Sequence, residues 1–340
     1  MKKVVAFGEI LLGLSPPGHL RFMQAHEFVM DFAGAEANAC VALSLNGVET
    51  EFVTRLPDHA IARRALAALH QYQVGTRHVV LGGERLGLYY LERGASQRPS
   101  RLIYDRKDSA ISLAKPDAFD WDAIMKAADV FLFTGITPAL GEHLPAICRD
   151  ACQAAHKAGA TVFCDLNYRK ALWSAERAQH VMKTLVRDVD VLVGNEEDAQ
   201  LALGADAGET DVVGGRLDYG QYSRMARRLT EEYGFKSVAL TLRSSLSASD
   251  NDWAGMLFRE GNACFSRSYR IHVVDRVGSG DSFTSGLIYA LLHGYDAQKS
   301  VEYATAASCL KQTTELNFNL SNASEIEQLM NGDGSGRIQR

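Results

Sequence analysis

Two glycines and a carboxylate stand together where a predicted strand gives way to a predicted helix. The run Asp275-Arg276-Val277-Gly278-Ser279-Gly280-Asp281 follows a β-like stretch at 269–273 and precedes a helix predicted over Ser282–His293. Gly278 and Gly280 let the backbone turn tightly and approach a ligand. Free N–H groups at a helix start attract an anion, so the pattern predicts an anion-binding turn.

The carboxylate of Asp281 needs a chemical reason at such a turn. It would repel a bound phosphate, and its presence is explained if it takes a proton from a hydroxyl that attacks the phosphate. Gly278, Ser279, Gly280 and Asp281 are therefore the candidate catalytic residues, with the amides holding the developing negative charge. A tight turn with an aspartate as helix cap is the plainer interpretation of the same residues, and it stays open.

Two other phosphate-binding patterns fail. Phe283 stands where the dinucleotide-binding fingerprint needs its third small residue, and no βαβ unit follows. No Gly-Lys-Ser or Gly-Lys-Thr occurs anywhere in the chain, which excludes a Walker A loop.

Bulk composition narrows the class of protein. The 340 residues are 46% apolar and 23% charged, as in a globular protein, and a net charge of −5 argues against nucleic acid as the main partner. No apolar run approaches the ~18 residues of a membrane span, so no membrane partner is expected. The six cysteines form no Cys-x-x-Cys pair and the ten histidines show no ligand spacing. We expect reduced thiols, a cytoplasmic location, and no zinc or iron site.

Short apolar strands alternate with helical segments along most of the chain, which predicts an α/β fold with a mainly parallel sheet flanked by helices. In such sheets ligands bind beyond the carboxyl ends of the strands. Four residues fall at those ends: Ile136, Arg169, Asn195 and Thr241. The expected strands cover residues 4–7, 49–55, 130–133, 161–165, 189–193 and 237–242, and the expected helices cover 34–46, 58–73, a segment ending near 158, one opened by Asn195, 297–311 and 323–330.

Two further segments, near 12–32 and 86–106, are expected to form a small β-sheet, in which residues 20–32 are one alternating strand. Residues 206–218 and 244–252 are predicted loops. With no repeat or linker in sight, we expect one domain over 1–330 and a flexible tail over 331–340.

Two motifs taken together resemble the signatures of the ribokinase (PfkB) family of sugar kinases. They are Gly34-Ala35-x-x-Asn38 and Asp275-x-x-Gly278-Ser279-Gly280-Asp281, and the resemblance runs from Val4 to about Met330. It implies a ribokinase-like fold with a small β lid, ATP as phosphate donor, Mg²⁺ as cofactor and a sugar as acceptor.

The resemblance also implies roles for single residues. Nucleotide contacts fall to Asn167, Asn195, Thr241, Arg243, Gly278 and Gly280. Magnesium would be held through water near Asn195 and Asp198, and Asp275 would help to hold a monovalent cation such as K⁺. Two positions depart from the family pattern, because Asp198 replaces a glutamate and Arg243-Ser244-Ser245 replaces a glycine-rich turn. The substrate residues implied are Gly34, Asn38, Tyr89, Tyr104, Arg106, Ile136 and Arg169.

Two arginines, Arg106 and Arg169, indicate which sugar is bound. A neutral sugar needs no cation, whereas arginine binds a carboxylate in a two-pronged fork, and a buried arginine without an anionic partner would be costly. The stretches at 104–107, 135–140 and 165–169 resemble the 2-keto-3-deoxygluconate kinase branch, which implies transfer to the 6-hydroxyl, giving 2-keto-3-deoxy-6-phosphogluconate. Arg169 could instead pair with Asp165 or contact ATP phosphate.

Several alternatives remain beside this interpretation. A fructokinase or a 5-keto-2-deoxygluconate kinase would carry the same motifs. A catalytically silent sugar-binding regulator is less favoured because Asp281 and the glycine pair are intact. A nucleoside kinase has no use for two arginines. The lid strands have edges that need covering, so we expect a homodimer or a larger homo-oligomer.

Overall fold

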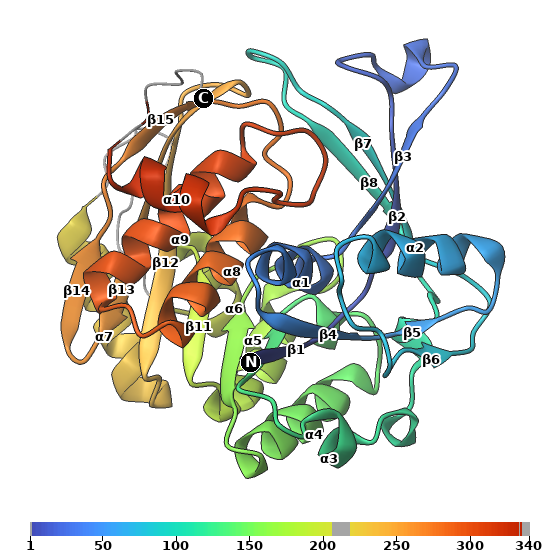
Figure 1. Ribbon diagram of the computed structural model, residues 1–340, viewed down its shortest axis with the longest axis horizontal. Coiled ribbons are helices and arrows are strands. Elements are labelled where there is room, and N and C mark those ends of the chain that lie inside the picture. Colours follow the sequence, from blue (N-terminus) through green and yellow to red (C-terminus); the bar gives the residue numbers. More distant parts are fainter. Residues whose placement is uncertain (1, 206–217, 333, 335–340) are drawn as a thin grey trace.

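A mostly parallel sheet forms the centre of the molecule (Figure 1). The computed structural model describes residues 2–205, 218–332 and 334. Within them, nine strands run in the order β14-β13-β12-β11-β10-β9-β1-β4, with β15 paired to β13. The neighbours from β12 to β4 are parallel, as predicted: β1 (Lys3–Phe7), β4 (Glu49–Val53), β9 (Val130–Thr134), β10 (Thr161–Asp165), β11 (Val191–Gly194) and β12 (Ser237–Ser245).

The other edge of this sheet is antiparallel, and its strands were not predicted in full. The strand after β12 is β13 (Asp250–Arg259), which pairs with both β14 (Asn262–Phe265) and β15 (Tyr269–His272). The expected loop over 244–252 is thus wrong in extent, because β12 and β13 approach each other as far as Ser245 and Asn251 and leave only a tight connection. Its serines and aspartates suggested a longer loop than the hairpin needs.

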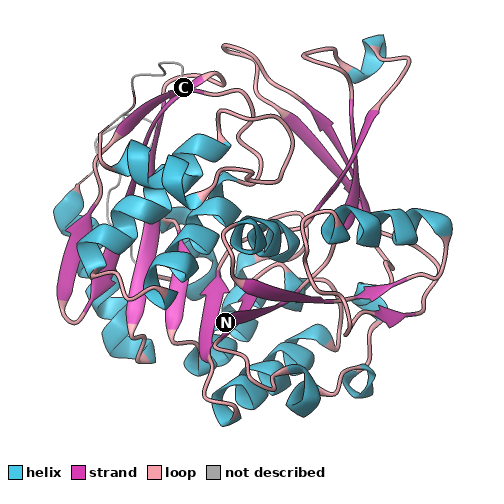
Figure 2. Ribbon diagram, viewed as in Figure 1, coloured by secondary structure: helices cyan, strands magenta, loops and turns pink. Residues whose placement is uncertain are grey.

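Helices cover both faces of the central sheet (Figure 2). Alternation along β1 divides the core: Val5 and Phe7 pack toward one set of helices, Val4 and Ala6 toward the other. The first set is α3 (Trp121–Ile124), α4 (Leu144–Lys157), α5 (Ala175–Leu185), α6 (Glu196–Leu203) and α7 (Tyr219–Tyr233). The second is α1 (Ala35–Leu45), α2 (Ala60–His70), α8 (Ser279–Leu292) and α9 (Ala297–Lys311), with α10 (Ala323–Met330) packed on α9.

A second, four-stranded sheet projects from the central one (Figure 1) and is called the small sheet below. Its order is β3 (Val29–Ala33), β2 (Leu11–Ser15), β7 (Leu88–Glu92) and β8 (Arg101–Asp105). The expected strand over 20–32 is wrong in its first part, where a short 3₁₀ turn, η1 (Phe22–Gln24), stands instead. Pro16, Pro17 and Gly18 precede that turn and interrupt extended pairing.

The strand register gives the small sheet two distinct faces. Asp31, Gly13, Tyr89 and Tyr104 are paired across the four strands, and so they share one face. The next row, Met30, Leu14, Tyr90 and Ile103, lies on the opposite face. Tyr89 and Tyr104 are thereby separated from Tyr90.

Shorter elements complete the described chain. A parallel pair, β5 (Arg55–Leu56) and β6 (Val80–Leu81), follows β4, and four 3₁₀ turns are η2 (Ile111–Leu113), η3 (Pro116–Ala118), η4 (Thr137–Ala139) and η5 (Val186–Asp188). All six cysteines are unpaired, as expected, and Cys148 and Cys152 are both buried on α4. No helix within the described residues is long and apolar enough to cross a membrane. The predicted tail over 331–340 and the predicted loop over 206–218 fall almost entirely outside the described residues.

Phe7 provides a test of the core. Its fully buried ring meets the rings of Phe119 and Trp121 edge-on, each at a centroid distance of 5.1 Å. Phe7→Ala removes these contacts and leaves a cavity, so it should lower the free energy of unfolding by about 3–5 kcal/mol in denaturant titrations. Phe7→Leu keeps most of the apolar volume and is expected to cost less than half as much. Equal costs for the two variants would contradict this packing.

Candidate active site

A cleft of about 730 Å³ lies between the carboxyl ends of the parallel strands and the inner face of the small sheet. Every residue that the sequence assigned to catalysis, substrate, nucleotide or magnesium lines it, and Asp275 does not. Residues from segments far apart in sequence are thus brought together. The predicted residues that line the cleft are Gly34, Asn38, Tyr89, Tyr104, Arg106, Ile136, Asn167, Arg169, Asn195, Asp198, Thr241, Arg243, Gly278, Ser279, Gly280 and Asp281.

The helix after the anion-binding turn begins three residues earlier than the sequence predicted. Helix α8 starts at Ser279 instead of Ser282, with Gly278 as its N-cap, so that Gly280 and Asp281 belong to the first turn. Gly278 has a φ of +80°, and a Cβ there would lie 2.3 Å from the carbonyl oxygen of Asn317. Only glycine meets both conditions, so the chain can turn here into the first turn of α8, whose residues Ser279, Gly280 and Asp281 line the cleft.

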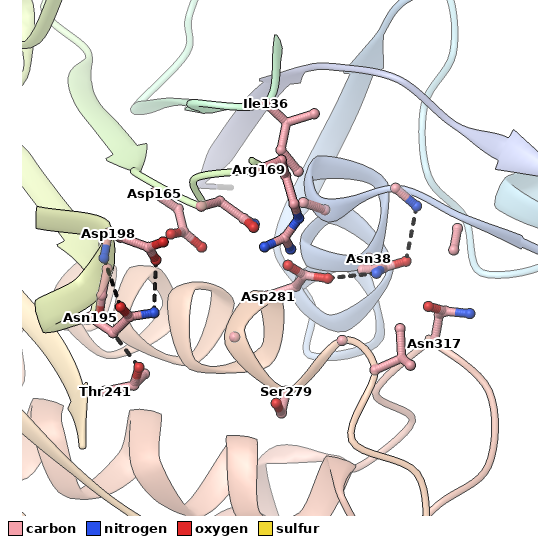
Figure 3. Close-up of a pocket in the computed structure, with 18 of the residues that line it drawn as sticks. Asn38, Ile136, Asp165, Arg169, Asn195, Asp198, Thr241, Ser279, Asp281 and Asn317 are labelled. Carbon is pink, nitrogen blue, oxygen red and sulfur yellow. Dashed lines mark hydrogen bonds between the residues drawn. The ribbon is translucent and has the colours of Figure 1, made fainter. Parts of the chain in front are cut away.

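Asp281 projects from this first turn and is held by Asn38 of α1 (Figure 3). The Asn38 amide donates to Asp281 Oδ2 at 2.6 Å, and Asn38 Oδ1 accepts from the Gly34 N–H at 3.4 Å. Burial raises the pKa of Asp281, while the Asn38 hydrogen bond and the positive charges of Arg169 and Lys311 partly offset that rise. The two motifs of the sequence thus meet at one carboxylate.

Arg169 extends toward Asp281 from the segment after β10 (Figure 3). Its guanidinium donates to the Tyr168 carbonyl at 3.3 Å, and no ion pair joins it to Asp165 within the described structure. Burial, together with the charges of Asp198 and Asp281, raises the pKa of Asp165 to about 7, against the opposing effect of Arg169. Arg169 is therefore a cation among carboxylates and can still attract an anionic ligand.

Arg106 is also buried, but its charge is already balanced inside the protein. Both its Nε, at 2.8 Å, and one terminal nitrogen donate to Glu9 Oε2. The expectation that this arginine requires an anionic ligand for its burial is therefore wrong, because Glu9 supplies the anion. The other oxygen, Glu9 Oε1, is buried without a hydrogen-bond partner, and Glu9 lines the cleft. This oxygen can accept a hydrogen bond from a ligand hydroxyl.

The far side of the cleft is built around the start of α6. Asn195 caps the helix by accepting from the Asp198 N–H at 2.9 Å and donates to Asp198 Oδ2 at 2.8 Å (Figure 3). Thr241 donates to the Gly194 carbonyl at 3.4 Å. Arg243 also lines the cleft, as does Arg276, which the sequence did not single out. Burial raises the pKa of Asp198 to about 6, an effect that the charge of Arg169 opposes.

Among the described residues, no group of three or more acidic, histidine or cysteine side chains could hold a metal ion. Asn195 and Asp198 hydrogen-bond each other, and Asp198 Oδ1 also accepts from the Tyr168 N–H at 3.1 Å. A carboxylate has further lone pairs beyond these bonds, so the pair can hold waters around an ion that a ligand brings with it. The assignment of Mg²⁺ to water-mediated contacts with Asn195 and Asp198 stays a prediction.

Asp275 lies under the anion-binding turn, outside the cleft. Its carboxylate accepts from Arg93 Nε at 3.1 Å and from the Val277 N–H at 3.1 Å. Lys311, the last residue of α9, donates from Nζ to the Asp275 carbonyl at 3.3 Å. The side chain that the sequence assigned to a monovalent cation is therefore bound to two protein donors.

Two structural residues of the site escaped sequence reasoning. Glu36 is buried on α1 and accepts at Oε1 from the Thr134 N–H and from the Thr134 and Thr137 hydroxyls, which ties α1 to the segment that presents Ile136. Asn317 donates to Asp31 at 2.6 Å and to the Tyr89 hydroxyl at 2.8 Å, joining the small sheet to the core. Glu36 lies in a helix and Asn317 in a loop, and no sequence pattern at either position indicates a role in the site.

The arrangement can hold a phosphate group and a hydroxyl nucleophile beside the carboxylate of Asp281, and the chain is similar to several known kinases. Similar proteins include the crystal structure of 2-dehydro-3-deoxygluconokinase from Thermotoga maritima, with a TM-score of 0.93 and 47% identity over 97% of this chain and 98% of that one. A 2-dehydro-3-deoxygalactonokinase from Haloferax volcanii is 32% identical over 98% of each chain. A 2-dehydro-3-deoxygluconokinase from Thermoproteus tenax is 30% identical over 91% of this chain and 88% of that protein.

The family profile spans both motifs that meet at Asp281. The pfkB family carbohydrate kinase profile matches residues 1–321, so it includes the small sheet, the central sheet and the turn before α8. With the structural likeness to solved kinases, this confirms the ribokinase-like fold that the sequence predicted. The chain belongs to the pfkB family of carbohydrate kinases.

Proposed function

We propose that the protein transfers the terminal phosphoryl group of ATP to the 6-hydroxyl of 2-keto-3-deoxygluconate, giving 2-keto-3-deoxy-6-phosphogluconate and ADP. The observation that carries the proposal is one cleft in which Asp281 stands beside the anion-binding turn while Arg169 extends toward it. Kinases of this family use ATP, and relatives named for 2-dehydro-3-deoxy sugar acids support the choice of acceptor.

In this mechanism Asp281 is the base. Its carboxylate takes the proton of the 6-hydroxyl while the bond from that oxygen to phosphorus forms and the bond from phosphorus to the ADP oxygen breaks. In a loose phosphoryl-transfer transition state the nucleophile loses its proton late, so a carboxylate is basic enough. The raised pKa of Asp281 makes it a better acceptor. The amides of Gly278, Ser279 and Gly280 hold the developing charge.

The sugar acid would lie under the small sheet, which we interpret as the lid of a single kinase unit over residues 1–330. Arg169, together with the terminal nitrogen of Arg106 that does not donate to Glu9, would bind its carboxylate. Glu9 Oε1 is a buried acceptor for one of its hydroxyls. The remaining contacts are assigned to Gly34, Asn38, Tyr89, Tyr104 and Ile136.

The nucleotide would occupy the side of the cleft formed by Asn167, Asn195, Thr241 and Arg243. Mg²⁺, held through water by Asn195 and Asp198, would neutralise charge on the ATP phosphates. Because all six thiols are unpaired, we further infer that the protein works in the reducing cytoplasm.

Replacing the proposed base tests its role. Asp281→Asn keeps the size of the side chain and an oxygen that can accept from Asn38, but it removes the negative charge. The kcat should therefore fall about 10³-fold or more, while the affinity for the sugar acid survives. A coupled assay of ADP release measures kcat. Asp296→Asn, the same change at the cap of α9 and outside the cleft, should leave kcat unaltered. Near-normal turnover by Asp281→Asn would rule out the base assignment.

A panel of acceptors tests the substrate class. We expect kcat/KM for 2-keto-3-deoxygluconate to exceed that for fructose by about 100-fold, because an arginine–carboxylate contact is lost with the neutral sugar. The panel also holds the galactonate epimer and 5-keto-2-deoxygluconate.

A paired variant isolates the contribution of Arg106. Glu9→Gln with Arg106→Gln removes both buried charges at once, avoiding an unpaired one. It should raise KM for the sugar acid more than KM for fructose, because only the sugar acid loses a contact with its carboxylate. A preference for fructose in the original protein would contradict the sugar-acid proposal.

We also propose that two copies associate through the outer face of the small sheet. Met30 and Ile103 are 51% and 53% exposed there, in the row that also contains Leu14 and Tyr90. Met23 in η1 is 96% exposed. Exposed apolar side chains on a sheet whose inner face is already used are typical of an interface between copies.

The molar mass in solution tests this association. The protein should have the mass of a dimer or larger oligomer by light scattering, and Met30→Lys with Ile103→Lys should reduce it to the 37.2 kDa of one chain, because each lysine would be buried without a partner. Leu320→Lys, at a side chain 51% exposed in the loop before α10, is the control that should change nothing. A monomeric original protein would refute the interface.

A further inference from the structure

We propose that Lys311 is a built-in cation beneath the anion-binding turn, which fixes the turn and supplies a positive charge behind its amides, so that catalysis needs no added monovalent cation. The inference rests on the proposed function, in which that turn holds the transferred phosphate. Lys311 contacts neither the cleft nor the reacting groups, so it is a positioning residue.

The first support is where the ammonium lies. Lys311 has no exposed surface, and its Nζ donates to two backbone carbonyls, those of Asp275 and Thr314, each at 3.3 Å. These carbonyls belong to the two segments that close under the turn, since the Val274 and Asp275 N–H groups both donate to the Gln312 carbonyl. One ammonium thus joins the segment before Gly278 to the segment after α9.

The second support is how close this group lies to the turn itself. A Cβ added at Gly278 would stand 3.5 Å from Lys311 Cε, so the lysine chain passes directly behind the glycine. Ser308, one helical turn earlier on α9, donates to the Ser279 carbonyl at 2.7 Å. Helix α9 therefore contacts both Gly278 and Ser279. The ammonium group of Lys311, at the end of this helix, lies outside the cleft.

The third support is the charge around it. Burial lowers the pKa of Lys311 to about 8, and the carboxylates of Asp275, Asp281 and Asp31 oppose that effect. The lysine is consequently charged at neutral pH. The Asp275 carboxylate already binds Arg93 and the Val277 N–H, so the negative charge that a soluble cation would need here is in use. A fixed ammonium performs the same electrostatic task without a binding equilibrium.

Removal and replacement of the charge form the test. Lys311→Ala should lower kcat about 100-fold in a buffer that contains Mg²⁺ and, as its only monovalent cation, a bulky quaternary ammonium. K⁺ or methylammonium should restore about tenfold of that loss by entering the space left. Lys311→Gln keeps a hydrogen-bond donor without charge; it should fold, as its melting curve will report, yet stay slow. The original protein should be equally active with or without K⁺.

A matched control separates charge at the turn from loss of any buried lysine. Lys3 is 9% exposed and donates to the Lys126 carbonyl at 3.1 Å, but it starts β1, at the end of the sheet away from the cleft. Lys3→Met should leave kcat unaltered in every buffer. A structural anchor alone would make Lys311→Ala unstable but would not make its kcat depend on the cation.

The pH profile gives an independent readout. The kcat of the original protein should decline as pH rises through about 8, where the ammonium loses its proton, and Lys311→Ala with K⁺ should lack this decline. The other charged or titratable groups that face Lys311 are Asp31, Asp275, Asp281, Arg93 and Tyr89. Burial raises the pKa of Tyr89 further above 8, and arginine does not titrate in this range.

Binding of a non-hydrolysable ATP analogue, followed by calorimetry, distinguishes the two proposals. Weaker binding by Lys311→Ala that K⁺ restores would support the built-in cation even if no sugar acid were phosphorylated, and the proposed function alone would then fail. Activation of the original protein by K⁺ beyond about twofold, full activity of Lys311→Gln, or no response of Lys311→Ala to any small cation would each overturn the built-in cation.

Discussion

The close approach of the Gly278 turn to the loop after α9 is the contact on which the cleft depends. The Asn317 carbonyl occupies the space that a side chain at position 278 would need, and the φ of +80° excludes most residues there. The same loop carries the Asn317 amide to Asp31 and Tyr89 of the small sheet. One tight packing contact therefore sets the helix start, the position of Asp281 and the position of the small sheet.

Charge in the cleft is balanced mainly by the protein itself. Among the cleft arginines, Arg106 pairs with Glu9, while Arg169 faces carboxylates without an ion pair to any of them among the described residues. Outside the cleft, Arg93 pairs with Asp275. Removing these charges from water is costly unless each has a partner. Arg169 is accordingly available to an anionic ligand, and burial raises the pKa values of its neighbours Asp165 and Asp198, an effect that the charge of Arg169 opposes.

The small sheet links ligand binding to the rest of the molecule through its two faces. Its inner row provides Tyr89 and Tyr104 to the cleft, and Gly13 between the strands leaves room for the Tyr89 ring, which a Cβ would contact at 2.3 Å. Its outer row is apolar, with Met30 and Ile103 exposed. Because a strand directs alternate side chains to opposite faces, the same four strands can serve a ligand and a partner at once.

Local pattern in the sequence was enough for the parallel sheet, most helices and the glycine-rich turn before α8, because strand ends and such turns carry their signal within a few positions. Most of the sixteen cleft residues came instead from the resemblance to a kinase family. Tertiary structure alone decided the rest. The Glu9–Arg106 pair, the Asn38–Asp281 hydrogen bond and the burial of Lys311 each join residues separated by long stretches of chain. Spacing cannot reveal which distant charges neutralise one another, and that balance determines which cations remain for a ligand.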